Sequence, residues 1–223
     1  MKKMLLMVVI GIAVIMLPAY QTAQASLTLQ GSVIYDGAAR NLIYDSDLNL
    51  TWLDYSHGLA SWSNQVTWAS GLSLTFNGTT FDDWRLPATD AFYSGWGFDG
   101  TTTAGYNITN SEMGYLYYSE LNNKGYLDTS GNVQSGYGLN NQAPFHELNS
   151  GYYWMDKLNQ DMPNEGWYYR TPVGSQGTHN KEYLHYALAV RDGNVAPVPV
   201  PPTIFLLGSG LVGLAGVRRK FKE

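Results

Sequence analysis

Two apolar segments, one near each end of the chain, restrict how much of it can form a globular fold. Residues 4–17 carry no charge and follow Lys2 and Lys3, and residues 203–217 are uncharged as well. About 170 residues lie between the two segments. That length suffices for one domain that buries about 70% of the surface exposed by its unfolded chain. We therefore expect a single globular domain over residues 26–195.

The N-terminal segment has the composition of a secretory signal peptide. Two lysines precede the apolar run, and Ala23 and Ala25 supply the small side chains of a signal-peptidase site. We predict cleavage between Ala25 and Ser26, which makes residues 1–25 a signal peptide. Basic residues lie outside both apolar segments, so the positive-inside rule places both ends in the cytoplasm and the domain beyond the membrane.

The C-terminal segment, residues 196–223, has three parts. Residues 196–202 are rich in proline, which favours extended backbone and cannot donate to a sheet. Residues 203–217 are predicted to form a transmembrane helix of about 22 Å, somewhat shorter than the ~30 Å hydrocarbon core. Residues 218–223 are mainly basic and are expected to stay in the cytoplasm.

This order of proline-rich, apolar and basic parts resembles the PEP-CTERM sorting signal. The resemblance implies a bacterial export substrate that is held in the inner membrane, cut near the prolines by an exosortase-type protease and released to the cell surface or extracellular matrix. Val200 stands where that family usually carries glutamate. An ordinary single-pass anchor is the alternative. The residues that carry the resemblance are Pro199, Val200, Pro201, Gly208, Ser209, Gly210, Arg218, Arg219 and Lys220.

The composition of the central domain excludes several kinds of partner and chemistry. Without the basic residues of the two ends and Glu223, 7 basic residues remain against 17 acidic ones, a net charge near −10. Such a charge argues against binding nucleic acid or an anionic membrane surface. The chain contains no cysteine, which excludes disulfides, a thiolate nucleophile and a Cys-ligated zinc site. Aromatic packing must therefore stabilise the fold.

The spacing of apolar residues predicts two helices. Residues 61–72 have apolar side chains at helical spacing, with Ser61 as a candidate N-cap. Residues 111–124 show the same pattern, and either Asn110 or Ser111 is placed to cap them.

Short β-prone runs flank these helices on both sides. Residues 45–49 look like the start of a calcium loop, but the glycine and glutamate that such a loop needs are absent, so we predict a turn there. Residues 128–142 are predicted to form a polar loop. The predicted strands are residues 27–29, 33–35, 42–44, 48–53, 151–154, 166–170 and 182–191.

The segment 81–87 brings together a large ring, a guanidinium group and two carboxylates. Arg85 follows Trp84, and Asp82 and Asp83 precede it. A guanidinium group in this setting is typically packed against the ring and bonded to a carboxylate or to backbone carbonyls. We predict a structural role for Arg85.

Several tryptophan- and arginine-containing segments occur in the order found in exported proteins of the Lcl C-terminal-type domain family, which this chain resembles over most of residues 42–195. The resemblance implies an α+β fold: a single irregular domain, similar to C-type lectins and to the formylglycine-generating enzyme, with a central antiparallel sheet and two helices. It also implies an adhesin that binds glycosaminoglycans. The residues that carry it are Trp52, Trp68, Asp83, Trp84, Arg85, Leu86, Pro87, Trp154 and Arg191.

No motif in the sequence selects a catalytic or metal site. The four histidines, His57, His146, His179 and His185, lie in unrelated segments without metal-ligand spacing. The 17 acidic residues of the domain are compatible with a carboxylate pair for glycoside hydrolysis, but no pattern singles out two of them. We predict no catalytic residue, no metal ligand and no cofactor.

Aromatic residues outside these motifs are the candidates for ligand binding. A flat ring beside a carboxylate lets a sugar stack while its hydroxyl groups form hydrogen bonds. We predict an adhesin or carbohydrate-binding module; a structural matrix component without a ligand and a glycan-active enzyme are the alternatives. The candidate glycan-binding residues are Trp96, Asp99, Trp167 and Tyr168.

Overall fold

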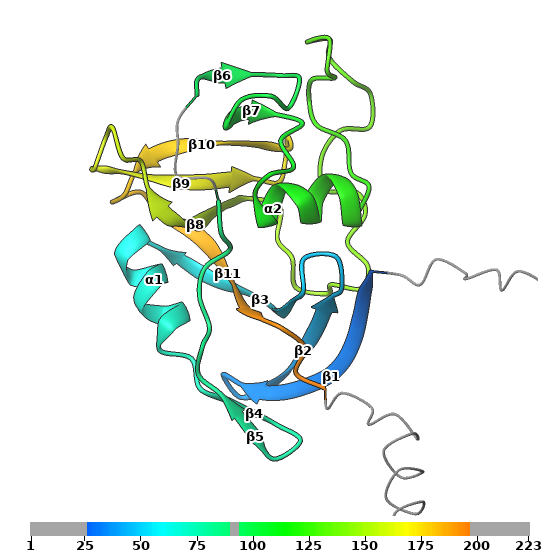
Figure 1. Cartoon of the computed structure of the whole chain (residues 1–223), viewed down its shortest axis with the longest axis vertical. Coiled ribbons are helices and arrows are strands. Elements are labelled where there is room, and N and C mark those ends of the chain that lie inside the picture. The colour runs from blue at the N-terminus through cyan, green and yellow to red at the C-terminus, as the bar shows by residue number, and fades with distance from the viewer. Residues whose placement is uncertain (1–25, 90–93, 197–223) are drawn as a thin grey trace, which may run out of the picture.

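A nine-stranded mixed sheet runs through the domain, and the computed structural model describes residues 26–89 and 94–196 (Figure 1). The predicted signal peptide, the proline-rich residues from 197 onward and the predicted transmembrane and sorting residues lie outside these ranges. Over the two described ranges, no helix has the length and apolar character needed to cross a membrane.

The strand order in the sheet is β1-β2-β3-β11-β8-β9-β10-β7-β6. Neighbours are antiparallel except β11 with β8 and β6 with β7, which are parallel. A separate hairpin joins β4 and β5. The strands are β1 (Leu27–Tyr35), β2 (Ala38–Asp45), β3 (Leu50–Ala60), β4 (Leu74–Phe76), β5 (Thr79–Phe81), β6 (Trp96–Gly97), β7 (Ala104–Tyr106), β8 (Tyr152–Leu158), β9 (Glu165–Arg170), β10 (Ser175–Asn180) and β11 (His185–Asp192).

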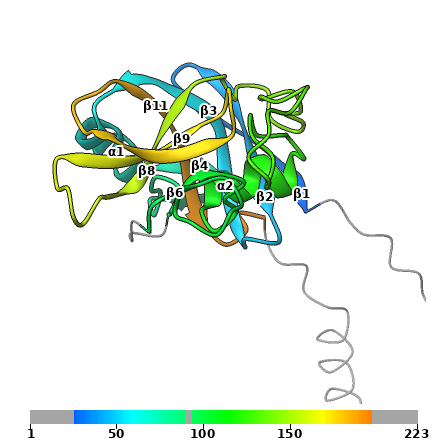
Figure 2. The ribbon, with the colours of Figure 1, turned by 90° about the horizontal axis from the view of Figure 1, so that it is seen from above.

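The fold is therefore mostly β, with a mixed sheet and two short helices, where we expected an α+β fold with an antiparallel sheet. The predicted number of helices is confirmed. The predicted strand direction is wrong in part, because side chains alternate with the same period in parallel and antiparallel strands and so do not report direction. Seen from above, α1 and β1 lie at opposite ends of the domain (Figure 2).

The first hairpin is longer than the sequence indicates. Gly31 was expected to separate two strands, but it forms a bulge inside the continuous strand β1. Its φ of 138° is unfavourable for other residues, and a Cβ atom there would lie 2.8 Å from Phe76 Cε2. The glycine therefore lets the β4–β5 hairpin approach β1 closely.

Both predicted helices form, and both are shorter than expected. The first, α1 (Trp62–Ser70), lacks the expected cap, since the Ser61 side chain makes no capping hydrogen bond. The second begins as α2 (Glu112–Tyr115), where Ser111 Oγ accepts a hydrogen bond from Gly114 N at 3.0 Å, and continues as the π-helical turn η1 (Leu116–Glu120). It ends before residue 124 because Asn122 adopts a positive φ of 50°.

The central strands are buried on both faces of the sheet, which creates two hydrophobic cores. Trp52 of β3 and Tyr153 of β8 point into one core, to which α2 contributes Met113. The next residues along those two strands, Leu53 and Trp154, point into the core on the other face, which is covered in part by α1. Because side chains alternate along each strand, the apolar residues of one sheet contribute to two cores, one on each face.

Strand β10 was not predicted. Its residues are Ser175, Gln176, Gly177, Thr178, His179 and Asn180. This segment has no apolar alternation, which is the signal on which a strand prediction depends. Gln176 nevertheless lies fully buried and donates through Nε2 to the Thr103 carbonyl at 2.6 Å, so hydrogen bonds hold this strand in place.

Arg85 is bonded to carboxylates, as one part of the prediction had it, and these partners are distant in sequence. Its guanidinium group donates to both carboxylate oxygens of Glu112 at 2.8 Å and to Asp192 Oδ1 at 2.6 Å. Its backbone forms an isolated bridge with Val190. Asp83, in contrast, binds Arg191, and this hydrogen bond lowers the pKa of Asp83. The two arginines join the segment 81–87 to β11 and α2.

Glu112→Ala is expected to lower the free energy of unfolding by about 2–3 kcal/mol, because it leaves Arg85 and the Ala88 N–H without their carboxylate. Asp192→Ala is the matched control. The Asp192 side chain is 79% exposed, against 15% for Glu112, so its loss should cost less than about 1 kcal/mol. Urea denaturation of both variants measures the difference, and equal losses would contradict this account of Arg85.

Candidate functional site

Strands β8, β9, β10 and β7 carry a row of cross-strand neighbours on one face of the sheet, the face to which Trp154 and Tyr168 also point. Tyr152 is opposite Arg170, Arg170 is opposite Ser175, and Ser175 is opposite Tyr106. Directly opposed residues point to the same face of a sheet, so these side chains share one surface. The Arg170 guanidinium carbon lies 5.2 Å from the centre of the Tyr152 ring.

Aromatic and imidazole rings extend this row in both directions. The His179 ring lies 4.1 Å from Tyr168 and 5.5 Å from Tyr152, measured between ring centres. Tyr183 lies 5.4 Å from His179 at one end, and Trp96 lies 6.0 Å from Tyr106 at the other. We name this surface the ring platform. Its members are Trp96, Tyr106, Tyr152, Arg170, His179 and Tyr183, and the buried Tyr168 packs against Tyr152 and His179.

Trp96 lies on the short edge strand β6, beyond β7 in the sheet order (Figure 1). Its side chain is 55% exposed. A Cβ atom at Gly177 of β10 would lie 3.1 Å from Trp96 Cζ3, so the missing side chain lets the indole lie against β10. The ring edge contacts Tyr106 at an interplanar angle of 90°. Trp96 is therefore held in place while much of its ring stays open to solvent.

Arg170 brings positive charge to the ring platform. Its side chain is half-buried, and its Nε lies buried without a hydrogen-bond partner in the described part of the chain. No carboxylate of the described residues forms an ion pair with it. The guanidinium group can therefore donate hydrogen bonds to a ligand oxygen.

The two histidines beside the platform form a hydrogen-bonded pair. His179 Nδ1 lies 3.0 Å from His185 Nε2, and His185 Nδ1 lies 2.8 Å from the Leu184 carbonyl oxygen. Donation from His185 Nδ1 to that carbonyl leaves its Nε2 as the acceptor for His179. Burial lowers the pKa of His185 to about 4 and also lowers the pKa of His179, so both rings are neutral at neutral pH.

The four predicted glycan-binding residues do not form one site. Trp167 is fully buried in the core that includes α2, and Tyr168 is 6% exposed, so neither presents a ring face to a ligand. Asp99 is exposed, and its Oδ1 already accepts hydrogen bonds from the backbone and hydroxyl of Thr101. Of the four, only Trp96 has an aromatic ring that is open to solvent.

Sequence reasoning missed most of the platform. Tyr152 was predicted to lie in a strand. The sequence did not indicate to which face of the sheet its side chain points, because the residues that follow it are aromatic as well. Arg170 and Tyr183 were not predicted as site residues, because neither belongs to a motif. His179 lies on β10, whose polar sequence gave no strand signal.

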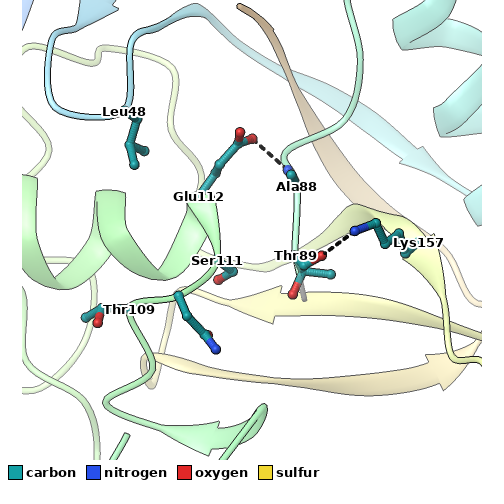
Figure 3. Close-up of a pocket in the computed structure, with 8 residues that line it drawn as sticks. Leu48, Ala88, Thr89, Thr109, Ser111, Glu112 and Lys157 are labelled. Carbon is teal, nitrogen blue, oxygen red and sulfur yellow. Dashed lines mark hydrogen bonds between the residues drawn. The ribbon is translucent and has the colours of Figure 1, made fainter. Parts of the chain in front are cut away.

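A polar pocket of about 310 Å³ lies elsewhere in the domain (Figure 3). Glu112 accepts a hydrogen bond from the Ala88 N–H at 2.6 Å, and Lys157 Nζ donates to the Thr89 carbonyl at 3.0 Å. The pocket is lined by Leu48, Ala88, Thr89, Thr109, Asn110, Ser111, Glu112 and Lys157.

In residues 26–89 and 94–196, no group of three or more His, Asp or Glu side chains is arranged to hold a metal ion. Comparison with protein-family models, curated proteins and solved structures found no match for this chain.

Because the pKa of His185 is lowered, we expect the free energy of unfolding to fall in mild acid. The unfolded chain binds a proton near pH 6.5, whereas folded His185 binds one only near pH 4, so protonation favours unfolding between these values. Lowering the pH from 7 to 4 should therefore remove about 1–2 kcal/mol through this residue, allowing for its partial solvation. Urea denaturation at several pH values should show a smaller loss over this range for His185→Phe. Identical slopes in both proteins would contradict the lowered pKa.

Proposed function

We propose that this chain is an exported bacterial protein of the cell surface or extracellular matrix that adheres to polysaccharide and catalyses no reaction. The observation that carries the proposal is the ring platform. Its two end members, Trp96 and Tyr183, are 55% and 56% exposed, and half-buried rings connect them. A pyranose ring stacks on such a surface through its apolar C–H face.

Polar groups next to the rings support the same function. Arg170 lies beside Tyr152, and its guanidinium group forms no ion pair within the described residues, so it can donate to the oxygen atoms of a sugar. His179 donates through Nδ1 to His185, which leaves its Nε2 as an acceptor for a hydroxyl group. Rings that exclude water, with a few fixed donors and acceptors at their edges, are the usual arrangement in sites for neutral ligands.

We also propose that the domain is C-type-lectin-like and of the Lcl C-terminal type. The position of the segment Trp84-Arg85-Leu86-Pro87 supports this fold, because the Arg85–Val190 bridge joins the segment to β11. The long loop between η1 and β8 is a second supporting feature, since this kind of domain carries long loops beside its sheet.

The route to the surface is proposed from the two ends of the sequence. The signal peptide over residues 1–25 would direct export, and the tail over residues 196–223 would hold the chain in the inner membrane until an exosortase-type protease acts. Nucleic acid is excluded as a partner by the strong net negative charge of the domain.

Trp96→Ala in the full-length chain is expected to reduce retention on immobilised polysaccharide by tenfold or more, because it removes the open stacking surface. Leu29→Ala is the matched control, since Leu29 is 54% exposed and lies on the opposite edge strand of the sheet. Both variants should melt within a few degrees of the wild type. A glycan array and thermal denaturation provide the measurements.

Three outcomes separate the alternatives. Retention that depends on Trp96, with no release of reducing sugar, supports the adhesin. Release of reducing sugar would overturn the proposal in favour of a glycan-active enzyme. Absence of retention on every polysaccharide, with a folded protein, would leave a structural matrix component.

A further inference from the structure

The polar pocket contains a buried hydroxyl group whose bonding is incomplete. Thr89 is 4% exposed, and its Oγ1 is buried without a hydrogen-bond partner in the described residues. The rest of this residue is fully bonded, because its N–H donates to Asp156 Oδ1 at 3.0 Å and its carbonyl accepts from Lys157. A buried hydroxyl without a partner costs about 1–3 kcal/mol, and a ligand group in the pocket would remove that cost.

On the opposite wall of the pocket, the Ser111 hydroxyl is already bonded. Figure 3 shows Thr89 and Lys157 on one side and Thr109 and Ser111 on the other. Ser111 Oγ accepts from Gly114 N and donates to Gln176 Oε1 at 2.6 Å. Lys157 has used one of its three ammonium donors on Thr89. Among the buried hydroxyl groups of the lining, Thr89 Oγ1 therefore has unmet hydrogen-bond capacity, and the Lys157 ammonium group beside it has two further donors.

Glu112 is not available to a charged ligand either. Its oxygens accept from Arg85 and from the Ala88 N–H. Around the pocket, Arg85 and Lys157 face the carboxylates of Glu112, Asp156 and Asp192, of which Asp192 is largely exposed. Because these carboxylates offset both positive charges, the pocket offers little net attraction to an anion and favours an uncharged ligand.

The size of the pocket limits the ligand to a small one. A volume of about 310 Å³ lies at the lower end of the range for ligand sites, which runs from roughly 300 to 1,000 Å³. Leu48 and Ala88 add apolar surface to the lining. We propose that this pocket binds one neutral sugar residue, with its hydroxyl groups bonded to Thr89 Oγ1 and Lys157 Nζ and a C–H face against Leu48.

This site is separate from the ring platform. The two share no residue. The platform lies along one face of β8, β9, β10, β7 and β6, whereas the pocket is formed by the chain after Pro87, the segment that leads into α2, and Lys157 near the end of β8. A platform suits the length of a polysaccharide, while a pocket that holds one residue suits a chain end or a side branch. Binding at the pocket does not depend on the function proposed for the platform.

The test uses the full-length chain and saturation-transfer NMR titrations with methyl glycosides of glucose, galactose, mannose and N-acetylglucosamine. Methyl glucuronide and glucosamine serve as the anionic and cationic comparators. At least one neutral glycoside should bind saturably and more tightly than either comparator. Thr89→Val should weaken that binding about fivefold, and Lys157→Met about tenfold. Leu29→Ala, on the edge strand farthest from the platform in the sheet order, should leave it unchanged.

Thermal denaturation without ligand distinguishes a binding role of the Thr89 hydroxyl from a structural one. Thr89→Val removes an unpaired hydroxyl without changing the volume of the side chain, so its melting temperature should equal or exceed that of the wild type. A lower melting temperature would indicate a structural role for the hydroxyl and would overturn the proposal. So would equal affinity in Thr89→Val, absence of binding by every neutral glycoside, or tighter binding of glucuronide than of any neutral sugar.

Discussion

Burial of the central strands on both faces of the sheet is the constraint on which this structure depends. Each of β3, β8 and β9 places alternate residues into two cores, and residues such as Trp52 and Leu53 have no exposed surface. In a chain without cysteine, this two-sided burial is the main source of stability, because each large apolar side chain removed from water contributes about 1.5–3 kcal/mol. The helices complete the burial, one for each core.

The same arrangement creates the candidate site. Strands β10, β7 and β6 extend the sheet beyond the central strands, and the ring platform runs from β8 and β9 across this extension. Gln176 connects this extension to the core, since Ser111 Oγ donates to its Oε1 and its Nε2 donates to Thr103. Polar contacts therefore position the platform, while apolar packing fixes the sheet to which it belongs.

Sequence reasoning succeeded where a local rule applied. The helix at residues 61–72 follows from apolar spacing, and the turn at residues 45–49 forms because Asp45 Oδ1 accepts from the N–H groups of Asp47 and Leu48. It failed where aromatic residues are consecutive. In the run Trp167-Tyr168-Tyr169, every position is apolar, so no alternation indicates the face of each ring, and Trp167 was assigned to the surface.

The sequence by itself determined the charge of the domain, the absence of disulfides and thiol chemistry, the predicted export signals at the two ends and most of the segments that form helices and strands. Those properties depend on composition and on neighbours within a few residues. Only the tertiary structure decided that Arg85 binds Glu112, that Trp96 stays open while Trp167 is buried, and that Arg170 and His179 both lie beside Tyr152. Each of these facts depends on strand register and order, which join residues far apart in the chain and which no local pattern records.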